Sequence, residues 1–159
     1  MGSRSKISQA YIAGFLDGDG SLMIQIKKRK DGRQKYRFML TICFYQDSRH
    51  EQPLHWIRNQ LGIGYISKRN DHISELRING YQQVREIIKS LLPYIRFKNN
   101  QAKALYRASR ILSKKKSSEL SKKNLLDLVS DILIVQKENY VTRHKKSKEE
   151  LLEILGLTP

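Results

Sequence analysis

The chain has 159 residues, of which 39% are hydrophobic and 8% aromatic, so it can form one compact core and is not a disordered chain. Its formal net charge of +16 predicts a polyanionic partner, with nucleic acid first and an acidic membrane second. The single cysteine, Cys43, excludes an internal disulfide and a zinc site built from cysteine pairs, and the sequence has neither an apolar run of about 18 residues nor a visible secretory signal.

The first predicted element is a helix over residues 8–18, with Ser8 as its N-cap. Ala10, Gly14 and Gly18 fall on one stripe of this helix, because residues four apart lie on the same face. A glycine inside a helix costs about 1 kcal/mol relative to alanine. Two glycines on one stripe therefore indicate a surface that packs very closely against something else.

Residues 21–29 and 36–45 alternate between apolar and polar side chains. A period of two predicts strands, and the turn residues between them predict a hairpin. The apolar face of the pair carries Leu22, Ile24, Ile26, Phe38, Leu40, Ile42 and Phe44.

A helix over 53–61 follows, and then a second hairpin with strands over 63–69 and 73–79. Four further helices are predicted over 81–92, 99–113, 121–137 and 147–155. Trp56 and Tyr65 are expected to be core residues. The order αββαββα followed by helices predicts an α+β fold. The whole chain is expected to be a single domain, with a core over about 8–113 and a C-terminal helical extension over about 114–159.

Residues 11–20 read YIAGFLDGDG, and the segment from Ile12 to Gly20 resembles the LAGLIDADG motif of homing endonucleases, position for position. LGIGY at 61–65 and PYIRFKNNQA at 93–102 resemble further landmarks of that family, so the resemblance covers nearly the whole chain. It implies an αββαββα core with a saddle-shaped antiparallel sheet. It also implies the activity of an intron-encoded homing endonuclease, which cleaves both strands of a long, near-palindromic DNA site.

The chain carries this motif once, and family members with one copy act as homodimers in which the two motif helices cross. The resemblance therefore implies a symmetric dimer with its interface at Ala10, Ala13, Gly14 and Gly18. The stripe of small residues supports the same interface independently, since small residues spaced by four allow two helix backbones to approach closely.

The motif places Asp19 at the end of its helix, and dimer symmetry would bring a second Asp19 beside it. Two carboxylates at close range repel unless a cation lies between them, and carboxylates with few other protein ligands suit Mg²⁺. Metal ions about 3.5–4 Å apart can activate a water and stabilise the leaving oxygen of a phosphodiester. The resemblance implies Asp19 and the Gly18 carbonyl as ligands of Mg²⁺, with Mn²⁺ also supporting activity and Ca²⁺ binding without cleavage. Asp17 is expected to be structural.

Two more catalytic positions follow from the resemblance. Gln46 matches a polar residue that orients water near the scissile phosphate, and Lys98 matches a basic residue that stabilises negative charge there. The sequence departs from the family at His50 and Glu51, where a close relative carries basic residues. That departure concerns the outer solvent network and not the metal ligands.

The polar face of the strands predicts how DNA is read. A twisted ribbon fits the major groove, where each base pair shows a distinct pattern of donors and acceptors. The dense cations of the hairpin tip, Lys28–Lys35, are expected to grip phosphates, and the dimer would span roughly 20 bp. Glu75 is expected either to accept from cytosine or only to orient Arg77. The expected DNA-binding residues are Gln25, Lys27, Arg29, Arg33, Arg37, Thr41, Arg69, Glu75, Arg77 and Arg143.

Two other functions use the same scaffold. An RNA-binding maturase would depend on the basic surfaces and not on Asp19, and a DNA-binding regulator would have lost catalysis. The joint presence of Asp19, Gln46 and Lys98 argues against the regulator. The expected location is intracellular with the DNA, in an organelle or in an archaeal or bacterial cytoplasm.

Overall fold

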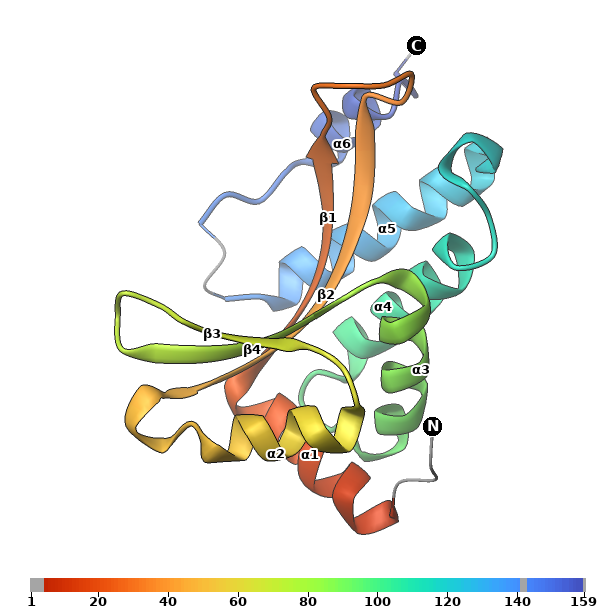
Figure 1. Ribbon diagram of the computed structural model, residues 1–159. Helices are drawn as coiled ribbons and strands as arrows, with labels where there is room; N and C mark the ends of the chain where they lie inside the picture. The colour runs from red at the N-terminus through yellow and green to blue at the C-terminus, as the bar shows by residue number, and fades with distance from the viewer. Residues whose placement is uncertain (1–4, 141–142, 159) are drawn as a thin grey trace.

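A four-stranded antiparallel sheet with helices packed on one of its faces forms the centre of the protein (Figure 1). The computed structural model describes residues 5–140 and 143–158. Three short 3₁₀ turns also occur, at Ser48–His50, Leu92–Tyr94 and Ser117–Glu119. The helices and strands in chain order are α1 (Lys6–Asp19), β1 (Gly20–Lys28), β2 (Tyr36–Asp47), α2 (Gln52–Leu61), β3 (Tyr65–Lys68), β4 (Ile73–Asn79), α3 (Tyr81–Leu91), α4 (Asn99–Leu112), α5 (Lys122–Glu138) and α6 (Lys148–Ile154).

The strand order in the sheet is β1-β2-β4-β3, so each hairpin contributes one edge strand and one central strand. The register places Ile42 of β2 opposite both Leu22 of β1 and Ile78 of β4. This row of apolar residues lies on the covered face, as the alternation of the sequence predicts. The opposite face of the sheet carries the polar set and remains open.

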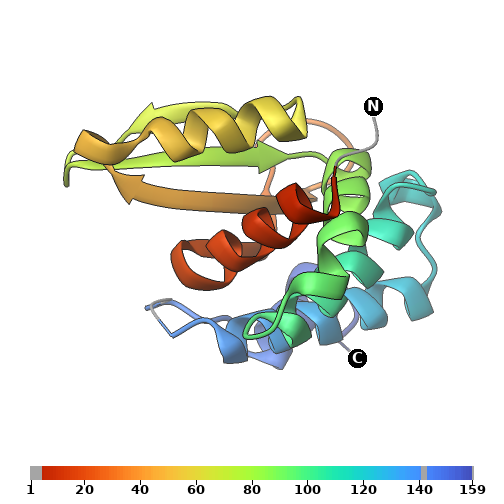
Figure 2. The same cartoon turned by 90° about the horizontal axis from the view of Figure 1, so that it is seen from below.

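The helices on the covered face form a layer around the motif helix. Figure 2 shows α1 between the strands on one side and the α4–α5 pair on the other. Both α4 and α5 contact β1, and their buried side chains include Leu105, Leu128 and Ile132. The outer sides of α4 and α5 therefore face away from the open face of the sheet.

The two edge strands differ in how their outer backbone is protected. At the β1 edge, the side-chain amide of Asn139, just after α5, donates a hydrogen bond to the Leu22 carbonyl (3.2 Å). At the other edge, β3 has four residues and ends on the exposed Lys68.

Most predicted elements are confirmed, with shifts at their ends. The predicted N-cap of the first helix is wrong: α1 begins one turn earlier, because the Ser5 hydroxyl accepts from the Ser8 backbone N–H (3.1 Å). Gly62 adopts a left-handed conformation (φ 72°) after α2, as expected for a glycine that follows a helix.

Two residues expected in the core are exposed instead. Trp56 is 38% exposed on α2, where its ring lies edge-on to Tyr11 with 5.3 Å between the ring centroids. Tyr65 is 51% exposed, because it opens the edge strand β3 and shares the open face of the sheet with its partner Arg77. Across the parts of the chain that the structure describes, no helix is both long and apolar enough to cross a membrane.

Candidate active site

Asp17, near the end of α1, fastens this helix to the start of α4. Its carboxylate accepts hydrogen bonds from the backbone N–H groups of Arg96 (2.6 Å), Phe97 (3.2 Å) and Lys98 (3.0 Å). These N–H groups belong to the turn before α4 and to its N-cap Lys98, and the carboxylate satisfies them there. The structural role predicted for Asp17 is confirmed.

This attachment brings the Lys98 side chain to the end of the motif helix. The Lys98 amine donates to the backbone carbonyl of Asp17, and the side chain is partly buried. Burial lowers the pKa of Lys98, while the nearby Asp17 and Asp19 act in the opposite direction. The Lys98 amine is therefore held at the C-terminal end of α1, where the helix carbonyls point, close to Asp19.

Asp19 is the last residue of α1, and both it and Gly18 are exposed. The next residue, Gly20, has no room for a side chain: an added Cβ would lie 2.6 Å from Leu16 Cδ1 and 2.9 Å from the Cys43 carbonyl oxygen. The sequence analysis did not identify this requirement, although the motif contains the glycine. Gly20 lets the chain turn from helix to strand in one step, and this turn fixes the position of Asp19.

The oxygen donors at the end of α1 fit a hard divalent cation. The exposed Asp19 carboxylate is adjacent in the chain to the Gly18 carbonyl, and Mg²⁺ takes a few such oxygens together with waters and substrate phosphate. Within residues 5–140 and 143–158, no group of three or more His, Cys, Asp or Glu side chains is arranged to hold a metal ion. Asp19 and the Gly18 carbonyl are therefore the oxygen donors that the end of α1 offers to such a cation.

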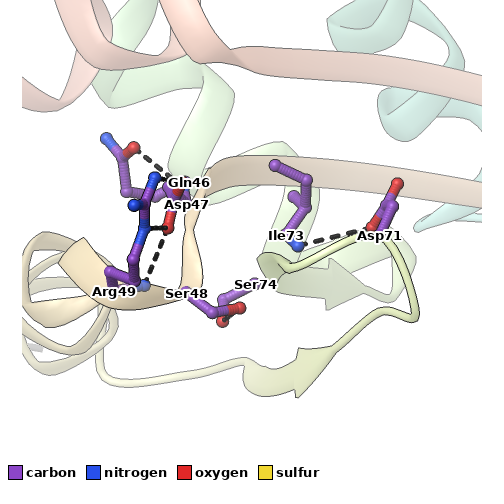
Figure 3. Close-up of polar contacts among 7 residues, drawn as sticks. All are labelled: Gln46, Asp47, Ser48, Arg49, Asp71, Ile73 and Ser74. Atoms are coloured by element: carbon purple, nitrogen blue, oxygen red, sulfur yellow. Dashed lines mark hydrogen bonds and ion pairs between the residues drawn. The ribbon is translucent and has the colours of Figure 1, made fainter.

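Gln46 lies at the end of β2, close to the junction between α1 and β1. The register pairs Phe44 with Gly20, so Gln46 extends two residues past this junction. Its side-chain oxygen accepts from the Asp47 backbone N–H (2.9 Å), as Figure 3 shows. Among the described residues no hydrogen bond joins Gln46 to Asp19 or Lys98, so the structure brings Lys98 to the motif but does not link Gln46 to either.

The turn after β2 is held by two carboxylates that the sequence analysis did not assign. Asp47 accepts two bonds from the Arg49 guanidinium, which keeps the pKa of Asp47 well below its usual value. The Ser74 hydroxyl donates to Glu51 (2.6 Å) and is the main cause that lowers the pKa of Glu51. His50 is exposed. Of the pair His50 and Glu51, only Glu51 is thus held by a short hydrogen bond within the protomer, among the described residues.

The stripe of small residues on α1 is open in the protomer. Ala10, Gly14 and Gly18 are exposed, and a Cβ added at either glycine would meet nothing within 4 Å. Ala13, in contrast, is completely buried in the protomer core. Its assignment to the dimer interface is wrong, because it lies on the side of α1 that packs inward.

Exposed apolar side chains continue the surface of this stripe. Ile7 is 83% exposed and Tyr11 52% exposed on α1, and they line a hollow of about 570 Å³ with Pro53 and Trp56 of α2. Exposed large apolar side chains gathered at one place usually mark an interaction surface.

The open sheet face presents most, but not all, of the predicted DNA-binding residues. Thr41 is completely buried and donates to the Asn79 side chain (2.8 Å), so its predicted contact with DNA is wrong. Glu75 is 8% exposed and accepts from the Arg77 guanidinium (3.1 Å), which is the arrangement expected for the orienting role. Gln25 and Arg77 are partly buried, and the exposed members are Lys27, Arg29, Arg33, Arg37, Arg69 and Arg143.

The β1–β2 hairpin and the segment before α6 form one basic surface. Arg143 lines a hollow of about 870 Å³ together with Lys28, Arg29 and Lys35 of the hairpin. Arg143 therefore lies on the same surface as the basic residues of the hairpin tip, although it is more than 100 residues away from them in the sequence.

Comparison with known proteins decides the family. A family model described as LAGLIDADG endonuclease matches residues 12–112. The chain is 31% identical over 137 residues to the DNA endonuclease I-CvuI of Chlorella vulgaris, and the match covers 86% of this chain and 81% of that protein. The chain belongs to the LAGLIDADG endonuclease family.

A second relative and a solved structure agree with this LAGLIDADG assignment. The DNA endonuclease I-CreI of Chlamydomonas reinhardtii is 29% identical over 92 residues, which are 58% of this chain and 56% of that protein. A crystal structure of I-CvuI in complex with the I-CreI target matches with a TM-score of 0.75 at 29% identity, covering 95% of this chain and 94% of that chain. The predicted fold and the single-motif LAGLIDADG architecture are confirmed.

Proposed function

We propose that this LAGLIDADG protein is a site-specific DNA endonuclease that acts as a homodimer and cleaves both strands of a long, near-palindromic site with Mg²⁺. Membership of the family and the similarity to I-CvuI and I-CreI support the endonuclease activity. The observation that carries the residue assignment is the Lys98 amine, fixed at the end of the motif helix beside the exposed Asp19.

The chain's own residues would divide the reaction as follows. Asp19 and the Gly18 carbonyl would hold Mg²⁺, and a bound metal ion would supply activation of a water and stabilisation of the leaving oxygen. The protonated Lys98 amine, anchored on Asp17, would stabilise the charge that develops on the phosphate oxygens. The Gln46 carbonyl oxygen accepts from the backbone, which leaves its NH₂ group to donate to a water or phosphate oxygen.

The small number of ligands in one protomer supports the proposed homodimer. Asp19 is exposed with few other ligands, while the open stripe of Ala10, Gly14 and Gly18 lies on the same helix. Pairing two α1 helices along this stripe would cover Ile7 and Tyr11 and place two Asp19 carboxylates near each other. The dimer would thereby complete the metal site and bury apolar surface in one step.

The open sheet face would read the DNA in the major groove. Arg77 is the best-positioned reader of a base, because Glu75 holds its guanidinium in place and Arg can pair bidentately with guanine. The exposed cations of the hairpin and Arg143 would contact phosphates and contribute affinity without sequence preference.

Cleavage of a randomised DNA library tests the proposal. Mg²⁺ should produce cutting at one long, near-palindromic sequence, and Mn²⁺ should also support cutting. Ca²⁺ should support binding without cutting; solved structures of I-CvuI hold DNA in the presence of either Mg²⁺ or Ca²⁺. Binding without cutting in both Mg²⁺ and Mn²⁺ would contradict the nuclease, and RNA would then become the ligand to test.

Asp19→Asn separates catalysis from binding in the same assay. The variant should bind the recovered site and fail to cut it, since an amide is a poor Mg²⁺ ligand. Glu86→Gln removes the same charge on the exposed face of α3 and should cut normally. Normal cutting by Asp19→Asn would refute the assigned metal ligand.

A further inference from the structure

The outer side of the α4–α5 pair carries a basic groove that the proposed cleavage reaction does not use. The groove encloses about 610 Å³, and its cations are Arg107 and Arg110 of α4, Lys114 and Lys115 of the following linker, and Lys123 of α5. Two acids, Asp127 and Asp131, also line it. The apolar sides of α4 and α5 face the sheet, so this groove opens on the side away from the DNA-reading face.

Internal ion pairs neutralise only part of this charge. The Arg107 guanidinium bonds to Asp131 (2.7 Å), and the Lys123 amine bonds to Asp127 (3.1 Å). Arg110, Lys114 and Lys115 have no acidic partner among the described residues. Arg110 lies over the ring of Tyr106, 5.9 Å from its centroid, and the Lys115 amine donates to the neutral Asn124 side chain (3.1 Å). The groove therefore keeps an excess of about three positive charges, counted from its lining residues.

The lining residues indicate what kind of anion fits. The five cations are spread along two helices and the linker between them, so they suit a row of phosphates better than one buried anion. The lining includes no aromatic ring on which a base could stack, and Ile111 is its only apolar residue. Contacts of this kind hold a nucleic-acid backbone without reading its sequence.

We propose that the α4–α5 groove binds the phosphate backbone of a second segment of duplex DNA while the sheet face holds the first. The proposal rests on the sheet face holding DNA as argued above. Duplex DNA is the favoured occupant because it is already the substrate of this protein family and surrounds any target site. Each protomer would thus have one sequence-reading surface and one sequence-independent surface on opposite sides. A second contact of this kind would let the protein pass between DNA segments while it searches.

A bridging experiment tests this second surface without knowledge of the target site. The full-length protein is added at low salt, in EDTA, to an immobilised 40-bp duplex of arbitrary sequence, and a second, labelled duplex of unrelated sequence is then supplied. Wild-type protein should retain the labelled duplex. Arg110→Glu and Lys114→Glu should each reduce this retention at least threefold and leave binding to the first duplex unchanged.

The controls separate the groove from general charge and from the sheet face. Lys89→Glu makes a charge reversal on the exposed surface of α3, outside the groove, and should bridge like the wild type. Arg37→Glu should instead weaken binding to the first duplex. Single-duplex binding without bridging, equal bridging by wild type and groove variants, or equal loss in Lys89→Glu would each overturn the proposal. Retention of an RNA hairpin but not of DNA would also overturn it and assign the groove to RNA. Failure of the wild type to bind any duplex would instead refute DNA binding by the sheet face.

Discussion

Asp17 contacts Lys98 twice: its carboxylate accepts from the Lys98 backbone N–H (3.0 Å), and its own carbonyl accepts from the Lys98 amine. One residue of the motif helix therefore sets both the backbone and the side-chain position of the proposed catalytic lysine. The neighbouring Asp19, the proposed metal ligand, remains exposed. The motif helix thus carries the proposed metal ligand and also positions the proposed catalytic lysine.

Asp17→Ala should destabilise the protein and slow cleavage together. Three backbone N–H groups in the turn that leads into α4 lose their acceptor, which should cost about 1–2 kcal/mol of unfolding free energy. Urea unfolding measures the first effect and single-turnover cleavage the second. Asp17→Asn keeps one acceptor oxygen and should fall between the wild type and the alanine variant. An alanine variant with unchanged stability would contradict the role assigned to Asp17.

Lys98→Met should reduce the single-turnover cleavage rate by roughly 10²-fold with little change in target binding, because charge stabilisation acts on the transition state. Burial lowers the pKa of Lys98, so the wild-type amine loses its charge at a lower pH than an ordinary lysine. The rate should accordingly fall at the alkaline end of the pH profile. Lys98→Arg stays protonated and should remove this alkaline fall from whatever activity it keeps. An identical alkaline fall in Lys98→Arg would assign the titration to another group.

Gly14→Leu should prevent dimerisation without unfolding the protomer. A Cβ at this position meets nothing within 4 Å in the protomer, so the larger side chain should be tolerated there. In the dimer it would separate the two α1 backbones. Sedimentation velocity should show a monomer, with a thermal midpoint close to that of the exposed control Ser118→Leu. A dimer of unchanged affinity would place the interface elsewhere.

Arg107→Met should destabilise the protein at neutral pH, because the buried Asp131 carboxylate loses its ion-pair partner. Asp131 is 3% exposed, and burial raises its pKa although Arg107 opposes the shift. The pKa of Asp131 is higher in the folded protein than in the unfolded chain. Asp131 therefore contributes fully to stability at a pH below its unfolded pKa, and this contribution is lost as the pH rises through its folded pKa. Without Arg107 the loss should reach about 3 kcal/mol at pH 7 and shrink towards pH 4. Denaturant unfolding at pH 7 and at pH 4 measures this loss of stability. A loss of equal size at the two pH values would contradict the ion pair between Arg107 and Asp131.

Arg77→Ala should relax specificity at one base pair in each half-site, with a discrimination loss of about 1–3 kcal/mol there. Arg29→Ala, at the hairpin, should weaken binding to all sequences alike and make binding less dependent on salt. Competition binding with single-base variants of the recovered site distinguishes the two. A uniform loss in Arg77→Ala would mean that Arg77 contacts only the backbone.

Alternation and helix periodicity predicted the elements and the face on which each strand residue lies, but not what covers that face. Thr41 and Cys43 lie on the polar side of β2 as expected, yet neighbouring side chains bury both completely. Trp56 was expected in the core but is exposed, because apolar character alone does not distinguish a core position on a helix from a surface one. The contacts of Asp17 with residues 96–98 could not be predicted, since they join segments about 80 residues apart.

The protection of the sheet edges has a consequence for how copies of this chain can meet. An unprotected edge invites a strand from another molecule and so leads to aggregation. Here the Asn139 amide occupies an outer carbonyl of β1, and β3 is short and ends in a lysine. Association through added strands is therefore disfavoured at both edges. Such edge protection leaves the helical surface of α1, and not the sheet, as the surface for the proposed dimer.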